Sequence, residues 1–180
     1  MGLITFTEFN DQKHLSVSKR NAMLMIAREL MTGNVITINS HEELMTAVQL
    51  MVDHGFRHVP ILEGGSLRSI ITALGAINGI VNNGVNALKE PVANHSSDKF
   101  ITASSDDDAV MVIKKMLNNN VDVALILRGN DLIGIITERD AVSKMPEQLF
   151  NKYRVHEVAN RRPICISEEA TLRAAMETMI

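Results

Sequence analysis

Aromatic side chains are scarce in this chain of 180 residues: they make up 3% of it, tryptophan is absent, and Tyr153 is the one tyrosine. A hydrophobic core must therefore be built from aliphatic side chains and the eleven methionines. The single cysteine, Cys165, cannot form a disulfide within the chain, which fits a reducing compartment. We therefore expect a cytoplasmic protein with an aliphatic core.

Charge of one sign is not in large excess either. The net charge is −3 with 22% charged residues, so the chain offers no basic field for nucleic acid or an anionic membrane surface. No apolar run approaches the roughly 20 residues of a membrane span, and the N-terminus lacks the apolar centre of a signal peptide. We expect a protein that binds neither membranes nor nucleic acid.

The short motifs of familiar enzymes are also missing. The sequence has no phosphate-binding loop, no Gly-x-Gly-x-x-Gly, no Cys-x-x-Cys pair and no Gly-x-Ser-x-Gly elbow. Histidines 14, 41, 54, 95 and 156 show among themselves no metal-ligand spacing such as His-x₃-His, and the acidic run 106–108 suits a helix N-terminus better than a metal. We therefore expect no enzyme, no catalytic residues, no metal and no required cofactor.

What the chain does contain is an internal repeat. Residues 35–77 align with residues 100–142 at a constant offset of 65, without a gap, and 12 of the 43 positions are identical. The clearest stretch places Leu67–Thr72 on Leu132–Thr137. Self-similarity at a fixed period predicts two copies of one structural unit.

Each copy predicts the order strand, helix, strand, strand, helix, an α/β (α+β) fold class. Ser40 and Ser105 are the expected N-caps of the first helices, and Glu43 has capping-box spacing from Ser40. Two apolar runs around a Gly-containing turn predict a hairpin, and second helices begin near Ala73 and Glu138. The expected strands are Val35–Ile38, His58–Leu62, Leu67–Ile71, Phe100–Ala103, Val123–Leu127 and Leu132–Ile136.

Further segments flank the two copies. Residues 16–31 are typical of a lead-in helix, while Pro163–Ile166 predicts a strand that would bury Cys165 as an inert thiol. An amphipathic helix follows and the chain ends within it, so we expect a partial third repeat of a longer chain, or one completed by a partner. The expected domains are residues 1–26 (N-terminal segment), 27–90 (repeat 1), 91–150 (repeat 2) and 151–180 (truncated third repeat).

This organisation resembles the CBS (cystathionine β-synthase) domain family. The resemblance rests on Leu30-Met31-Thr32 ahead of the first strand and on the run from Gly134 to Asp140 after the second hairpin. It covers residues 27–145 and part of 155–180. It implies that the two repeats pack pseudo-symmetrically into one Bateman module, with an adenine-containing ligand in the cleft between them.

The family motif implies a ligand site in the second repeat, at Gly134, Thr137 and Asp140. Asp140 would accept hydrogen bonds from the ribose hydroxyls, and Thr137 would lie near a phosphate. Thr137 can equally be a helix cap only, and Asp140 a solvated first-turn carboxylate. In the first repeat Ser69 and Gly75 replace Gly and Asp, so we expect a degenerate site there, to which Gly75→Asp would restore some affinity.

The resemblance also suggests the remaining contacts of the ligand. The adenine side would be formed by Ile101, Thr102, Ala103, Asp122 and Val123. Candidates for binding phosphate are Arg57, His58 and Arg139. Arg57 and His58 can instead be the polar edge of a strand.

We therefore expect a regulatory sensor that binds AMP, ADP, ATP or S-adenosylmethionine. The alternative is a protein-interaction or dimerisation scaffold with a vestigial ligand cleft. We expect a homodimer formed through the Met-rich helix faces, and an effector protein or a missing C-terminal domain as a further partner.

Overall fold

The computed structural model of the protein describes residues 25–144, 154 and 163–179. They form two compact units. The first contains the described residues up to Asn34 together with Ile101–Ile164, and we call it the repeat-2 unit. The second contains Val35–Phe100 together with the described residues from Cys165 onward, and we call it the repeat-1 unit.

Both repeats have the expected order of elements. Each has a short strand, a helix, a β-hairpin and a second helix. In the repeat-1 unit these are β1 (Ile38–Asn39), α3 (Leu44–His54), β2 (His58–Glu63), β3 (Ser66–Thr72) and α4 (Ala73–Asn83), followed by the 3₁₀ helices η1 (Gly84–Lys89) and η2 (Val92–His95). In the repeat-2 unit they are β4 (Ile101–Ser104), α5 (Ala109–Asn118), β5 (Val123–Arg128), β6 (Asp131–Thr137) and α6 (Glu138–Lys144), preceded by α2 (Ala27–Leu30).

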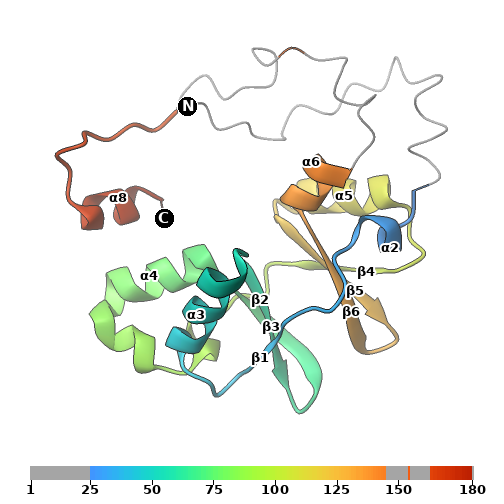
Figure 1. Ribbon diagram of the computed structural model, residues 1–180, viewed down its shortest axis with the longest axis horizontal. Helices are drawn as coiled ribbons and strands as arrows, with labels where there is room; N and C mark the ends of the chain where they lie inside the picture. The colour runs from blue at the N-terminus through green and yellow to red at the C-terminus, as the bar shows by residue number, and fades with distance from the viewer. Residues whose placement is uncertain (1–24, 145–153, 155–162, 180) are drawn as a thin grey trace. The chain divides into compact units, whose positions relative to one another are not determined.

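The two sheets have the same topology. Each has three strands, in the orders β1-β2-β3 and β4-β5-β6, with one parallel pair and one antiparallel hairpin. The hairpins shift register at equivalent places, and their turns contain Gly64 (φ 58°) and Gly129 (φ 60°), where a side chain would be strained. Figure 1 shows α3 and α4 beside β1–β3, and α5 and α6 beside β4–β6.

The cores are aliphatic, as the scarcity of aromatic residues predicts. Positions related by the offset of 65 are buried in both units. They include the pairs Ala47 and Val112, Met51 and Met116, Ile61 and Ile126, Ile71 and Ile136, and Ala76 and Ala141. One pattern of burial therefore serves both repeats, so the sheet and the helix faces that position the site are built twice.

The segment that leads into each repeat pairs with the sheet of the other repeat. Thr32 exchanges two backbone hydrogen bonds with Ile135 of β6 (2.8 and 3.0 Å), and Ser97 exchanges two with Ile70 of β3 (2.8 and 2.9 Å). Residues 25–32 thus lie in the repeat-2 unit, and residues 90–97 lie in the repeat-1 unit. We call these two segments strap 25–32 and strap 90–97.

The straps are held by the same backbone contacts at the same offset. In strap 25–32, the N–H of Ala27 donates to Asp107 O and that of Arg28 to Ser105 O, while Met25 O accepts from Ala109 N. In strap 90–97, the corresponding bonds are Val92 N to Glu42 O, Ala93 N to Ser40 O and Leu44 N to Glu90 O. The repeat therefore extends beyond residues 35–77 and 100–142, into segments whose sequences differ.

Several local predictions were wrong. The helices begin at Leu44 and Ala109, so their N-caps are Glu43 and Asp108 and not Ser40 and Ser105. The capping box at Glu43 is also absent, because Glu43 makes no side-chain cap. Asp108 does cap its helix, since its carboxylate accepts from Met111 N at 2.9 Å.

The expected third repeat is described only in part. Pro163–Ile166 forms no strand, and Cys165 is exposed rather than buried, since neither of the two described sheets includes this segment. The helix does form, as α8 (Leu172–Met179). Of the expected lead-in helix, α2 forms Ala27–Leu30, and the part up to residue 24 lies outside the described residues.

Among the helices that the structure describes, none combines the length and the apolar character that crossing a membrane requires.

The cap assignment predicts the effect of two neighbouring substitutions. Asp108→Ala should destabilise the fold by about 1 kcal/mol, because Met111 N loses its acceptor. The control Ser105→Ala should change stability by less than about 0.5 kcal/mol. Urea unfolding measures both, and a larger loss for Ser105→Ala would contradict this helix start.

Candidate functional site

Asp140 lies in the first turn of α6 and is 8% exposed. Its Oδ2 accepts hydrogen bonds from the backbone N–H (2.9 Å) and the hydroxyl (2.7 Å) of Thr137, the residue before the helix. Its Oδ1 accepts from the hydroxyl of Thr32 (2.9 Å) and from Lys144 Nζ (2.8 Å). A carboxylate has about four lone-pair sites, so protein donors occupy all of them.

Lys144 connects this carboxylate to strap 25–32. Its Nζ donates to Leu30 O (2.8 Å), and it lies 3.3 Å from Met31 O and 3.2 Å from Thr32 Oγ1. The ion pair with Asp140 spans one turn of α6, and the Lys144 side chain is 36% exposed. Lys144 is therefore the cation of this site, and its exposed side chain can be rearranged.

Gly134 allows the strap to approach β6. A Cβ atom at this position would lie 2.2 Å from Met31 Sδ and 2.9 Å from Met31 Cγ. Any larger residue would therefore push Met31 away from the strand. All three motif residues thus lie where strap 25–32, β6 and α6 meet.

The Asp140 carboxyl is held in its charged form. Burial by itself raises its pKa, but the hydrogen bonds from Lys144, Thr137 and Thr32 together outweigh burial and lower the pKa below its ordinary value. The site therefore presents a largely buried anion at neutral pH. Such a group can accept hydrogen bonds from hydroxyls or pair with a cation.

The equivalent place in the repeat-1 unit is built differently. Thr72 caps α4, because its hydroxyl accepts from Gly75 N at 3.0 Å. A Cβ atom at Gly75 would lie 2.8 Å from His95 O, and one at Gly79 would lie 2.5 Å from His95 Nδ1. The expectation that Gly75→Asp restores affinity is therefore contradicted: the aspartate would collide with the backbone of strap 90–97.

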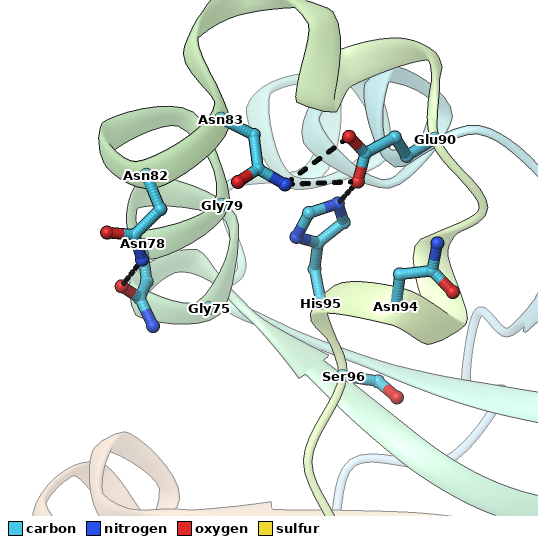
Figure 2. A pocket seen from close by; sticks show the side chains of 9 residues that line it. All are labelled: Gly75, Asn78, Gly79, Asn82, Asn83, Glu90, Asn94, His95 and Ser96. Carbon is cyan, nitrogen blue, oxygen red and sulfur yellow. Dashed lines mark hydrogen bonds and ion pairs between the residues drawn. The ribbon is translucent and has the colours of Figure 1, made fainter.

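A polar cavity of about 480 Å³ lies beside these glycines, within the repeat-1 unit. Figure 2 shows α4 along one wall, and Glu90 and the His95 imidazole pointing toward each other from the other wall. The lining residues are Gly75, Asn78, Gly79, Asn82, Asn83, Glu90, Asn94, His95 and Ser96. We call this cavity the asparagine pocket.

The adenine-side candidates lie on β4 and at the start of β5. Thr102 is exposed, Ile101 and Asp122 are half-buried, and Ala103 and Val123 are buried in the core. Only the backbone of Val123 could therefore face a ligand. Thr102 and Ala103 also border a shallow cavity of about 630 Å³ whose lining includes Asp106 and Asp107.

The phosphate candidates are divided between the two units. Arg57 is exposed and His58 is buried, at the start of β2 in the repeat-1 unit. Arg139 is exposed on α6 in the repeat-2 unit, beside Asp140.

Four contributors were missed from the sequence: Thr32, Lys144, Glu90 and His95. A signal for them existed, because the offset of 65 relates Lys144 to Gly79 and Thr32 to Ser97. These positions lie outside the segments that align by identity. Finding them requires knowing that each strap pairs with the sheet of the other repeat.

A family model described as CBS domain matches residues 27–81 and 92–147. Among curated proteins, the chain is 24% identical over 148 residues to an uncharacterised 33.4 kDa protein of Thermofilum pendens, covering 72% of this chain and 49% of that protein. It spans between about a third and three fifths of the first four curated relatives that it matches.

Solved structures share the fold. Protein MJ1225 of Methanocaldococcus jannaschii, described as a candidate archaeal homologue of g-AMPK, has a TM-score of 0.72 at 21% identity, covering 86% of this chain and 62% of that one. The CBS domain pair of protein MJ0100, solved in complex with 5′-methylthioadenosine and S-adenosyl-L-methionine, has a TM-score of 0.60 at 22% identity, covering 71% of this chain and 96% of that one.

The lowered pKa of Asp140 predicts how stability depends on pH. The carboxylate stabilises the fold above the ordinary Asp pKa of about 4, and this contribution is lost as the pH falls through the lower folded-state value. Asp140→Asn should therefore flatten the decline in Tm between about pH 5 and about pH 2. Asp131→Asn, which changes an exposed carboxylate at the start of β6, is the control; equal flattening by both would contradict the assignment.

Proposed function

Because this chain belongs to the CBS domain family, we propose that its repeat pair is a regulatory module that binds an adenine-containing ligand. The observation that carries the proposal is Asp140, a largely buried anion in the first turn of α6 with the complete motif Gly134, Thr137 and Asp140 around it. Such a carboxylate suits the two hydroxyls of a ribose. The ligand is AMP, ADP, ATP or S-adenosylmethionine, and the protein has no catalytic role in this proposal.

The two oxygens of Asp140 have different roles in this proposal. Oδ2 is committed to the start of α6, through Thr137. Oδ1 faces Thr32 and Lys144, two side chains that can rotate away. A ribose hydroxyl therefore replaces one of these donors at Oδ1, and the displaced Lys144 ammonium is free to meet a phosphate or a carboxylate of the ligand.

Regulation follows from this exchange of partners. The donors that the ligand displaces also hold strap 25–32, so the bound and free states differ in how firmly the strap is attached. A ligand shifts a conformational equilibrium only by its difference in affinity for the two states. The output is then read by an effector protein or by another domain of a longer protein.

The competing function is a scaffold. All lone-pair sites of Asp140 are already filled by the protein's own donors, and this observation favours a motif that only fastens the strap. The scaffold would pair with another chain and bind no adenine ligand.

Calorimetry separates the two functions. A thermal-shift screen against AMP, ADP, ATP and S-adenosylmethionine selects the ligand, and Asp140→Ala should then weaken its binding at least about tenfold, because hydrogen bonds to a charged group are lost. Circular dichroism checks that the variant folds, and Asp131→Ala is the matched carboxylate control. Unchanged affinity, or no binding of any of these ligands by the wild type, would favour the scaffold.

We also propose that the chain forms a homodimer through its helix faces. Exposed apolar side chains support this, since Met45 (47% exposed) and Val52 (71%) lie on α3, and Met111 (57%) lies on α5. Light scattering at micromolar concentration should give twice the chain mass of 19.9 kDa. Val52→Lys should shift the protein toward the monomer, whereas a wild-type monomer would contradict the pairing.

A further inference from the structure

The first repeat does not contain a merely degraded copy of the second repeat's site. Four equivalent positions differ in chemistry, two on the second helix and two on the strap. The pairs are Asp140 and Gly75, Lys144 and Gly79, Met25 and Glu90, and Leu30 and His95. In the repeat-2 unit, α6 supplies the charged side chains at these positions and strap 25–32 supplies apolar ones. In the repeat-1 unit, strap 90–97 supplies the ionisable side chains, and α4 has glycine at both of its positions.

The glycines make room for an imidazole. The His95 side chain is 6% exposed, and its Nδ1 would be 2.5 Å from a Cβ atom at Gly79. Alanine in place of Gly79 would therefore have to displace the His95 ring. His95 is thus seated against the second turn of α4, next to the cavity shown in Figure 2.

The buried nitrogen of this imidazole lacks a hydrogen-bond partner. His95 Nε2 lies 2.9 Å from Glu90 Oε2, but the two are not aligned as a hydrogen bond, and Nε2 has no other partner. An imidazole lone pair and a carboxylate oxygen this close repel each other unless a proton or a cation lies between them. A buried polar group without a hydrogen bond is costly, so a donor that reaches both His95 Nε2 and Glu90 Oε2 would stabilise the pair.

The rest of the lining defines the charge of a ligand with such a donor. Among the described residues that line the pocket, Glu90 is the only carboxylate and there is no lysine or arginine. Asn83 Nδ2 lies 3.3 and 3.4 Å from the two oxygens of the Glu90 carboxylate. Asparagine side chains fill most of the remaining wall and offer both donors and acceptors. A phosphate would meet Glu90 without a compensating cation, so the pocket favours a positively charged group.

The donor set suits an organic cation better than a metal ion. Within the residues that the structure describes, no group of three or more His, Cys, Asp or Glu side chains gathers to hold a metal. A primary ammonium carries three donors, which match in kind the acceptors that Glu90 Oε2, His95 Nε2 and the asparagine amide oxygens of the lining offer. A volume of about 480 Å³ accommodates a small ligand.

We propose that the asparagine pocket binds a small organic cation with a primary ammonium group, held between Glu90 and His95. The site goes beyond the proposed adenine site, because its residues belong to the repeat-1 unit and do not include Asp140. In this proposal the first repeat binds an amine. The absence of the motif aspartate there then reflects a different ligand specificity and not the loss of a site.

Calorimetry on the full chain tests the charge preference. The probe is putrescine (1,4-diaminobutane), and its neutral isostere 1,4-butanediol is the ligand control. Putrescine should bind saturably below about 10 mM, and the diol should bind at least about tenfold more weakly. No saturation by putrescine below about 10 mM, or equal binding of the diol, would overturn the proposal.

Substitutions test the location. Glu90→Gln keeps the shape of the side chain and should weaken putrescine binding at least about tenfold, whereas Glu63→Gln, an exposed carboxylate outside the pocket, should not. Asp140→Ala should leave putrescine binding unchanged, which separates this proposal from the adenine site. Wild-type affinity in Glu90→Gln would overturn it.

A spectroscopic readout keeps the test independent of how well the variants fold. In wild-type protein labelled with ¹⁵N, putrescine should shift the imidazole Nε2 resonance of His95, which is assigned by its loss in His95→Leu. His41, His54 and His58 serve as internal controls, because they belong to the described part of the chain and do not line the pocket. Binding that leaves the His95 resonance in place would show that the amine binds elsewhere and would contradict the proposal.

Discussion

The pairs of backbone hydrogen bonds that Thr32 makes with Ile135, and Ser97 with Ile70, determine how the rest of the structure is organised. β3 and β6 each end a three-stranded sheet and present unpaired backbone groups at that edge. Each edge is covered in part by the strap that precedes the other repeat. Neither repeat is therefore a self-sufficient unit, and the chain has to pass from one unit to the other to complete both sheets.

This exchange brings the functional chemistry to the straps. Gly134 and Asp140 are placed against strap 25–32 by the same pairing that covers β6, and Lys144 fastens the strap through Leu30 O. A ligand group that reaches Asp140 Oδ1 must take the place of Thr32 or of Lys144, and both side chains link the strap to α6. On this view ligand binding and strap attachment are coupled, and the coupling free energy is the difference between the hydrogen bonds broken and those formed.

The two units also illustrate how one scaffold can carry two chemistries. The backbone bonds of the straps are repeated almost bond for bond, while the side chains at four equivalent positions exchange charged, apolar and glycine character. A site requires only that its few polar groups be positioned by a rigid frame, so a change of side chains at fixed backbone positions changes what is bound. Asp140 and the side chain of His95 are the largely buried polar groups at the centre of the two proposed sites.

Much of the fold could be predicted from the sequence. The repeat at an offset of 65 indicates two copies of one unit, and the periodic apolar positions of each first helix, which include Met51 and Met116, mark the helix face that is buried. The helix starts were misplaced: for α5, Ser105 and Asp108 are both capping residues by type, and only the three-dimensional turn decides between them. Asp140 and Thr137 were found by their motif. Lys144 and His95 were not, because their roles depend on the exchange of the straps, which no local pattern encodes.

The most direct test of this account is which strap pairs with which sheet in solution. In an NMR spectrum of the full chain, the exchanged arrangement predicts inter-strand nuclear Overhauser effects between Thr32 and Ile135 and between Ser97 and Ile70. The corresponding amides should also exchange slowly with solvent. Contacts between Thr32 and Ile70 and between Ser97 and Ile135 would instead mean that each strap serves its own repeat, and would contradict the account.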